Sequence, residues 1–203
     1  VGVYPTSPAE EVEFLLALSE SRYAVCEDQE QVDKLLECKA RLPALEAIVV
    51  IDPKGLRHYD RTGLHDFEAV LRLGAELERA QPGLVDEHLA AQRGDDTALM
   101  IFTSGSTGRP KAAMITYDNI NAAAAGGTAL YGFSAADTVL SYLPLCHVAE
   151  QTFTVFNPIA VGATVNFAES LRTVQSDLRE IAPTLFLGVP RIWEKLPAAM
   201  DIK

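Results

Sequence analysis

The sequence predicts an α/β protein with layered, parallel-rich sheets that are joined by crossover helices. Three observations support this class. Short apolar or β-branched runs alternate with helical patterns along the chain, which is the rhythm of parallel sheets. Hydrophobic residues make up 48% and charged residues 22% of the composition, as in globular proteins. The length of 203 residues is sufficient to bury a sizeable core.

The alternation of strands and helices starts at the N-terminal end. Val1–Tyr4 is a short apolar run, and Ser7-Pro8-Ala9-Glu10 carries the capping and proline signals of a helix start. Tyr23–Cys26 is predicted to be a strand, and Asp28 is suited to cap the helix that follows it. Leu45–Ile51 is a β-branched run before a turn, so we expect a third strand there.

The middle of the chain is more polar. Residues 52–65 hold most of the turn signals and are predicted to be a surface loop. Asp66 is placed to cap a helix with an apolar face, which Pro82-Gly83 ends. Residues 84–93 are predicted to form one more short helix.

The alternation restarts in the last hundred residues. The strands expected there are Thr97–Thr103, Ala112–Ile115, Thr138–Leu143, Ala163–Phe167 and Thr184–Gly188. The helices expected there are Asp118–Leu130, residues 147–160, a helix that Ser170 caps and a last helix that Pro190 opens. Two apolar helix stripes are expected to pack in the core, namely Val12, Leu15 and Leu16, and Leu171, Val174 and Leu178.

The charge of the chain is acidic and uneven. With 17 basic and 28 acidic residues the net charge is 17 − 28 = −11. Residues 1–96 hold 20 acids and 10 bases (−10), whereas residues 97–203 hold 8 and 7 (−1). Without a basic cluster, nucleic acid is excluded as a partner, and attachment to an anionic membrane is disfavoured. We therefore divide the chain into an acidic α/β portion, 1–96, and a near-neutral portion, 97–203.

The cysteines favour a cytoplasmic protein. Cys26, Cys38 and Cys146 form no C-x-x-C pair, and an odd count indicates reduced thiols. Cys26 and Cys38 lie within apolar patterns and are expected to be buried.

The segment after the strand Thr97–Thr103 has the composition of a polyphosphate loop. Gly105 and Gly108 allow backbone N–H groups to approach an anion closely. The Ser and Thr hydroxyls between them donate further hydrogen bonds, and Lys111 supplies a positive charge. Thr107 is suited to present an oxygen to the Mg²⁺ ion that accompanies a nucleotide triphosphate. This near-neutral part of the chain is therefore the predicted site of anion binding.

Two other motifs are excluded here, and a third interpretation is disfavoured. In a Walker A loop the lysine follows the glycine directly, but Arg109 and Pro110 separate Gly108 from Lys111. A nucleophile elbow requires Gly-x-Ser-x-Gly, which neither Ser104 nor Ser106 satisfies. A plain Ser/Gly turn is the remaining alternative, which the ordered ending with proline and lysine disfavours.

Residues Thr103–Lys111 resemble the phosphate-loop signature of the adenylate-forming superfamily. This superfamily includes acyl-CoA synthetases, luciferases and peptide-synthetase adenylation domains. Three further stretches match it, namely Gly2–Ser7, Ser141–Glu150 and Gly188–Lys195. Together they resemble most the long-chain fatty acyl-CoA synthetase branch, over essentially the whole chain. One departure is Ala112, where relatives usually have glycine.

The resemblance implies an ATP-dependent acid–thiol ligase of fatty acid metabolism. A fatty acid would react with ATP to give acyl-AMP and pyrophosphate, and coenzyme A would then displace AMP to form acyl-CoA. The residues that would hold the ATP phosphates are Thr103, Ser104, Gly105, Ser106, Thr107, Gly108 and Lys111, with Thr107 also a candidate ligand of Mg²⁺.

The resemblance also implies a substrate pocket. His147 would border the adenylate and the acyl chain and is the candidate catalytic residue. Taken alone, it is equally well explained as a histidine at a helix start. Gln151 stands where some long-chain relatives carry an aromatic gate, which puts such a gate in doubt. Gly188, Val189 and Pro190 would complete the pocket, beyond the end of a strand.

Other signatures of the superfamily are missing from the sequence. Neither the aromatic-Gly-x-Thr-Glu segment nor the Thr-Gly-Asp segment occurs, and the small C-terminal domain with its catalytic lysine is absent. We therefore expect residues 1–203 to be part of an N-terminal AMP-binding domain that makes no acyl-CoA alone. The alternatives are another adenylating enzyme, such as an aryl-CoA ligase or a peptide-synthetase domain, and a non-catalytic nucleotide-binding or interaction module. Acyl chain length, oligomeric state and peripheral membrane contact stay open.

Overall fold

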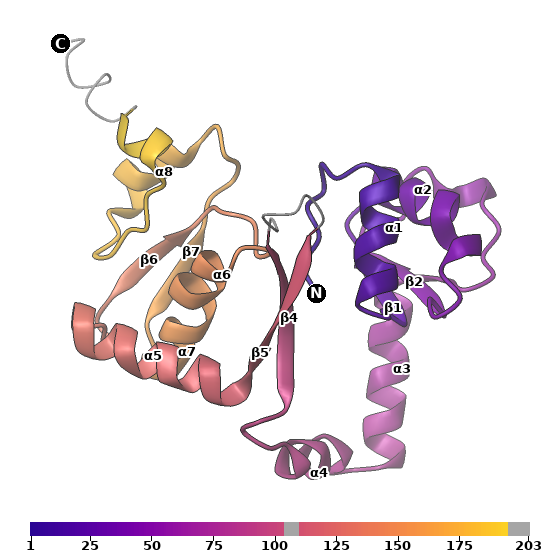
Figure 1. Ribbon diagram of the computed structural model, residues 1–203, viewed down its shortest axis with the longest axis horizontal. Coiled ribbons are helices and arrows are strands. Elements are labelled where there is room, and N and C mark those ends of the chain that lie inside the picture. Colours follow the sequence, from indigo (N-terminus) through magenta and orange to yellow (C-terminus); the bar gives the residue numbers. More distant parts are fainter. Residues whose placement is uncertain (104–109, 195–203) are drawn as a thin grey trace. The chain divides into compact units, whose positions relative to one another are not determined.

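The computed structural model describes residues 1–103 and 110–194 (Figure 1). Its elements fall into two units, one formed mainly by residues 3–114 and the other by residues from 115 onward. Each unit combines helices with parallel strands. The predicted α/β class with parallel sheets is therefore confirmed.

The first unit contains four α-helices and five strands among its described residues. The helices are α1 (Ala9–Leu18), α2 (Gln29–Cys38), α3 (Phe67–Ala80) and α4 (Leu84–Ala91). The strands are β1 (Tyr23–Cys26), β2 (Ala47–Val50), β3 (Leu64–Asp66), β4 (Thr97–Thr103) and β5 (Lys111–Thr116), the last of which leads into the second unit. Short 3₁₀ turns lie at Lys39–Arg41 and Leu56–His58.

Strands β1, β2 and β3 form a parallel sheet in that order. In its register Tyr23 is paired with Ala47, and Ile48 is paired with Leu64. The β-branched side chains of the central strand drive this arrangement, because Ile48 and Val50 are fully buried. The predicted strand Leu45–Ile51 is thus confirmed at its centre.

One hydrophobic core lies beneath this sheet, where α1 and α2 pack side by side (Figure 1). Its buried members are Val12, Leu16, Cys26, Val32, Leu35, Cys38, Leu42, Leu45, Ile48, Val50, Leu56 and Leu64. Strand β1 alternates between the two faces, since Cys26 is buried whereas Tyr23 and Val25 are 59% and 61% exposed.

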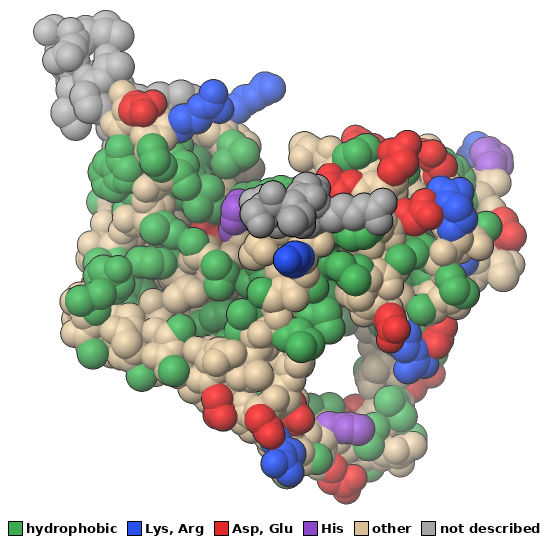
Figure 2. Space-filling model, viewed as in Figure 1, with side chains coloured by type: hydrophobic (Ala, Val, Ile, Leu, Met, Phe, Trp, Pro, Cys, Tyr) green, Lys and Arg blue, Asp and Glu red, His purple; other side chains and the backbone are tan. Residues whose placement is uncertain are grey.

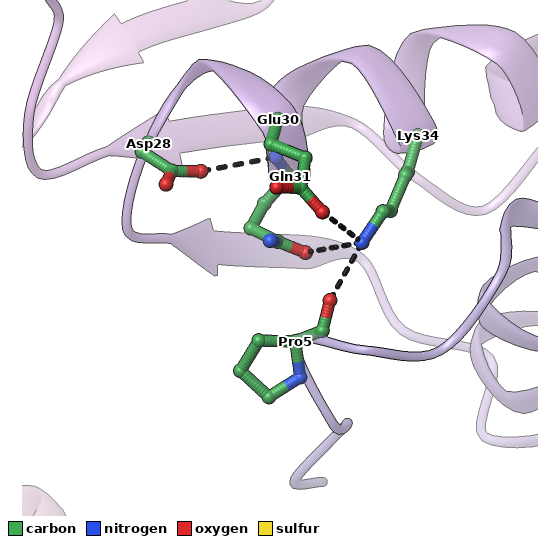
Figure 3. Close-up of polar contacts among 5 residues, drawn as sticks. All are labelled: Pro5, Asp28, Glu30, Gln31 and Lys34. Carbon is green, nitrogen blue, oxygen red and sulfur yellow. Dashed lines mark hydrogen bonds and ion pairs between the residues drawn. The ribbon is translucent and has the colours of Figure 1, made fainter. Parts of the chain in front are cut away.

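Polar contacts fix the start of α2 (Figure 3). The Asp28 carboxylate accepts a hydrogen bond from the Gln31 amide at 3.2 Å, which confirms the predicted cap. The Lys34 ammonium donates to the Pro5 carbonyl at 2.6 Å and to the Gln31 side chain at 3.3 Å, and it pairs with Glu30 at 2.8 Å. Lys34 therefore ties the segment before α1 to helix α2.

Several predicted features of the first unit are wrong. Val1–Tyr4 is not a strand, since the chain turns there and the Ser7 amide donates to the Tyr4 carbonyl at 3.0 Å. Helix α1 begins at Ala9 after Pro8, without a side-chain cap. Asp66 caps no helix either, because its carboxylate accepts from Arg61 at 2.9 Å. Strand β3 begins at Leu64, which is buried, so residues 64 and 65 belong to a strand and not to the predicted loop 52–65.

The thiol of Cys26 provides a test of this core. Burial raises its pKa from 9.0 to about 11, and the charge of Asp28 adds to the rise. We expect the folded protein at pH 8 to alkylate at Cys26 roughly 100-fold more slowly than the urea-unfolded protein, because the thiolate is the nucleophile. Mass spectrometry of iodoacetamide-treated peptides measures this, and equal rates would contradict it. The stability that the neutral buried thiol contributes is present below pH 9.0 and is lost as pH rises toward 11.

The second unit is built around a strand with parallel neighbours on both sides. Its helical segments are α5 (Tyr117–Tyr131), α6 (Val148–Glu150), a π-helical segment (Gln151–Phe156), α7 (Asn157–Val161) and α8 (Val174–Ile181). Its strands are β6 (Thr138–Ser141) and β7 (Thr164–Phe167), which pair in parallel. On the other side of β6, Val139 forms a parallel bridge with Leu185.

The long helix of this unit differs from the predicted helix 147–160 in its winding. It runs without a break from Val148 to Val161, but its middle has the π form. It packs against α5, and Gly162 at φ +79° ends it (Figure 1). π segments are frequent at functional sites, which directs attention to Gln151–Phe156.

Three predictions for the second unit require correction. The predicted strand Thr184–Gly188 is reduced to the single bridge at Leu185, and the strand that starts at Thr138 ends at Ser141 rather than Leu143. The predicted helix at Ser170 begins only at Val174, so Leu171 is 64% exposed instead of buried.

Candidate functional site

The two ends of the predicted phosphate loop lie next to each other. Thr103 ends β4 and Lys111 begins β5, and these strands form a two-stranded sheet. The Thr103 hydroxyl donates a hydrogen bond to the Lys111 carbonyl at 3.4 Å. The remaining predicted phosphate-binding residues lie outside the described residues, namely Ser104, Gly105, Ser106, Thr107 and Gly108.

The side chain of Lys111 is not used to build the fold of the described chain. It is exposed, and its ammonium forms no hydrogen bond or ion pair within residues 1–103 and 110–194. Its charge is thus available to an anion without the loss of an internal contact.

His147 and Gln151 lie on one turn at the start of the long helix. His147 is exposed, and its amide donates to the Pro144 carbonyl at 3.1 Å. Its own carbonyl accepts from the Gln151 amide at 3.2 Å. The Gln151 side chain donates to the Leu145 carbonyl, so it ties down the turn that presents His147. The structure therefore brings these two predicted site residues together.

The segment Gly188–Pro190 is held by two aromatic side chains. The Tyr142 hydroxyl donates to the Leu187 carbonyl at 2.9 Å and accepts from the Val189 amide at 3.2 Å. The Trp193 indole N–H donates to the Gly188 carbonyl at 2.7 Å. Trp193 is 51% exposed, so it supports this segment from the surface and not from a core.

Contacts between aromatic rings also help to hold the segment Gly188–Pro190 in place. Phe186 stacks on Tyr142 with ring centroids 5.4 Å apart, and it meets Trp193 edge-on at 5.7 Å. Pro190 begins a helix, as predicted. Because Tyr142 follows β6 directly, the carboxyl end of this strand fixes the segment that contains the last three predicted pocket residues.

A buried acid that the sequence prediction missed lies at the same strand end. The Glu150 carboxylate is 1% exposed and accepts hydrogen bonds from the Ser141 hydroxyl at 2.6 Å and the Thr154 hydroxyl at 3.1 Å. Among the described residues it has no ion-pair partner. The sequence did contain a signal for this buried acid, because Glu150 is the one Asp, Glu, Lys or Arg between Asp137 and Glu169.

Glu150 also influences the neighbouring tyrosine. Burial raises the pKa of Tyr142, and the negative charge of Glu150 adds to this rise, whereas the hydrogen bond from the Val189 amide opposes it. The hydroxyl that bridges Leu187 and Val189 is therefore protonated and remains a donor at neutral pH.

Charged side chains are unevenly distributed over the surface. In the view of Figure 2 they crowd the first unit and are sparse over the second, in line with the uneven charge of the sequence. Within the described ranges no group of three or more His, Cys, Asp and Glu side chains is arranged to hold a metal ion. None of the helices in those ranges has the length and apolarity to cross a membrane.

The fold and the candidate site together indicate the class of protein. The chain is an α/β protein whose candidate ligand-binding segments follow the carboxyl ends of strands, where such folds bind ligands. It belongs to the family of AMP-binding enzymes, because the model of that family matches residues 1–203.

Curated relatives agree with this assignment. The chain is 35% identical over 207 aligned residues to the long-chain-fatty-acid–CoA ligase ACSBG2 of Xenopus laevis, and it is 33% identical to human ACSBG2. These alignments cover 98% and 97% of the chain, but only 27% and 29% of the two relatives. The chain thus spans less than a third of the length of either relative.

Solved structures share the fold. The anthranilate CoA ligase AuaEII, in complex with anthranoyl-AMP, matches 91% of the chain and 34% of its own length, with a TM-score of 0.72 and 24% identity. A long-chain-fatty-acid–CoA ligase, FadD1 of Archaeoglobus fulgidus, matches all of the chain and 37% of its own length, with a TM-score of 0.70 and 19% identity.

Proposed function

We propose that the chain is part of the N-terminal domain of an ATP-dependent long-chain fatty acid–CoA ligase. In this proposal a fatty acid carboxylate oxygen attacks the α-phosphorus of ATP, and pyrophosphate leaves. The thiol of coenzyme A then attacks the acyl carbon, giving acyl-CoA, AMP and the thiol proton. The observation that carries the proposal is the family match over the whole chain, together with relatives that are named long-chain-fatty-acid–CoA ligases.

The loop Thr103–Lys111 is assigned to the β- and γ-phosphates of ATP. Its two ends are held together at the β4–β5 sheet, and Lys111 has no competing partner in the described chain. Backbone N–H groups and a lysine stabilise the pyrophosphate as negative charge develops on it. Ser104, Gly105, Ser106, Thr107 and Gly108 belong to this assignment by their position in the motif, and Thr107 is also assigned to Mg²⁺.

The pocket for the acyl-adenylate is assigned to the second unit. His147 is exposed, and the turn that presents it is held by the hydrogen bond from the Gln151 side chain to Leu145. Gly188, Val189 and Pro190 lie on a segment that the hydrogen bonds of the Tyr142 hydroxyl hold in place. Such preorganised segments orient substrates without a reorganisation cost during the reaction. We assign the enzyme to the cytoplasm, with peripheral membrane contact as a further property to be measured.

Exchange between ATP and pyrophosphate tests the substrate class. The full-length enzyme is assayed with saturated fatty acids of increasing length and with aryl acids. We expect exchange to be fastest with long-chain fatty acids, and the 203-residue chain alone to form no acyl-CoA. Exchange with aryl acids alone would favour an aryl-CoA ligase, and no exchange with any acid would favour a non-catalytic nucleotide-binding module.

A further inference from the structure

The Glu150 side chain connects both candidate substrate-binding segments of the second unit. On one side it accepts from Ser141, the last residue of β6, and the next residue is Tyr142. On the other side it accepts from Thr154 in the π segment. The Thr154 hydroxyl is closer to the Glu150 backbone carbonyl, at 2.8 Å, and lies on the same helix as Glu150, so it is the bond from Ser141 to Oε1 that joins the strand end to the helix.

The cost of this arrangement suggests that it serves a purpose. A carboxylate that is 1% exposed and lacks an ion-pair partner in the described chain is expensive to bury. The two hydroxyls and the amino-terminal end of the helix that begins at Val148 offset that cost only in part. A core built for stability alone would place an apolar side chain at this position.

The residues beside Glu150 explain what the carboxylate positions. Gln151 follows it directly and holds the turn at Leu145, which presents His147. On the strand side, Tyr142 holds Leu187 and Val189. A shift of the helix relative to the strand end would therefore move His147 relative to the Gly188–Pro190 segment.

We propose that Glu150 is a positioning residue that sets the placement of His147 relative to the Gly188–Pro190 segment by locking the π-helical turn to the end of strand β6. The proposal rests on the function proposed above. Because the bond from Ser141 goes to one oxygen, a glutamine at this position keeps it, whereas an alanine loses it and leaves Thr154 its bond to the backbone carbonyl of residue 150. The role thus depends on the acceptor atom and not on the charge.

Steady-state kinetics of the full-length enzyme test the role. We expect Glu150→Ala to lower kcat of fatty-acid-dependent pyrophosphate exchange at least about 10-fold, with the KM for ATP changed less than about twofold. Glu150→Gln should stay within about threefold of the unchanged enzyme in kcat. Ser141→Ala combined with Glu150→Ala should be no worse than Glu150→Ala alone, because the two residues act through one contact.

A stability control separates positioning from folding. Val32→Ala removes a fully buried side chain from the core of the first unit, which contains none of these residues, and should lower the melting temperature while leaving kcat and KM unchanged. If Glu150→Ala behaves like Val32→Ala, or if Glu150→Gln is as impaired as Glu150→Ala, the positioning role is overturned.

Hydrogen exchange provides a readout that needs no substrate. In the unchanged enzyme the Gln151 amide donates to His147 and the Val189 amide donates to Tyr142. Glu150→Ala should speed exchange at both amides at least about 10-fold, and Glu150→Gln should not. Unchanged exchange in Glu150→Ala would overturn the proposal even if the enzyme ligates no fatty acid, so its failure is distinguishable from that of the proposed function.

Discussion

Lys111→Ala in the full-length enzyme should lower the rate of fatty-acid-dependent ATP–pyrophosphate exchange about 100-fold, as is usual when a preorganised donor to developing charge is removed. The reason is that the Lys111 ammonium stands at the end of the predicted phosphate loop and has no other partner in the described chain. The effect should appear in kcat, because the leaving pyrophosphate carries more charge in the transition state than in bound ATP. Exchange of labelled pyrophosphate into ATP measures it directly.

Two variants control this experiment. Lys111→Arg keeps the positive charge and should retain activity to within about 10-fold, although the geometry of a guanidinium differs from that of an ammonium. Lys54→Ala removes another exposed lysine, 90% accessible and paired with Asp52, and should leave the rate unchanged. An unchanged rate in Lys111→Ala would remove the assigned role of this residue.

Gly188→Ala is the second substitution with a large expected effect. A Cβ atom at Gly188 would overlap the indole ring of Trp193, whose N–H donates to the Gly188 carbonyl. Either the ring or the segment must move, and displacement by about 1 Å near a reacting centre can lower the rate about 100-fold. We therefore expect kcat/KM for the fatty acid to fall between about 10-fold and about 100-fold.

A double-mutant cycle tests whether the clash with Trp193 is the cause of the expected loss in kcat/KM. Trp193→Ala removes the obstacle, so Gly188→Ala combined with Trp193→Ala should be close to Trp193→Ala alone. Additive losses in the double variant would show that the clash is not the reason. Full activity of Gly188→Ala would contradict the assignment of Gly188 to the substrate pocket.

Much of the fold could be predicted because local signals and tertiary packing agree. Asp28 caps α2 as its position before an apolar stripe indicates, and the β-branched run around Ile48 is the central strand of its sheet. Leu64–Asp66 was missed because three residues among turn signals show no periodicity. Its strand character comes from pairing with β2, which no local pattern contains.

The candidate site could be predicted less completely than the fold, because it too depends on contacts that no local sequence pattern contains. The periodicity of residues 147–160 indicates a helix, but nothing in a period of 3.6 distinguishes the π winding of Gln151–Phe156. The side chains that hold the candidate site in place do so through contacts between residues far apart in the sequence, such as the hydrogen bond from the Tyr142 hydroxyl to the Leu187 carbonyl. Glu150 was recognisable only as an isolated charge in an apolar stretch, and its partners became known from the structure.

The function proposed above requires that the full-length enzyme joins a fatty acid carboxylate to the α-phosphate of ATP. The most direct test supplies the full-length enzyme with ATP, coenzyme A and a long-chain fatty acid whose carboxylate carries a heavy-oxygen label. Because a carboxylate oxygen attacks the α-phosphorus and stays with it when the thiol forms acyl-CoA, the AMP that is released should carry one labelled oxygen. Unlabelled AMP, or label in inorganic phosphate together with ADP, would contradict the claim.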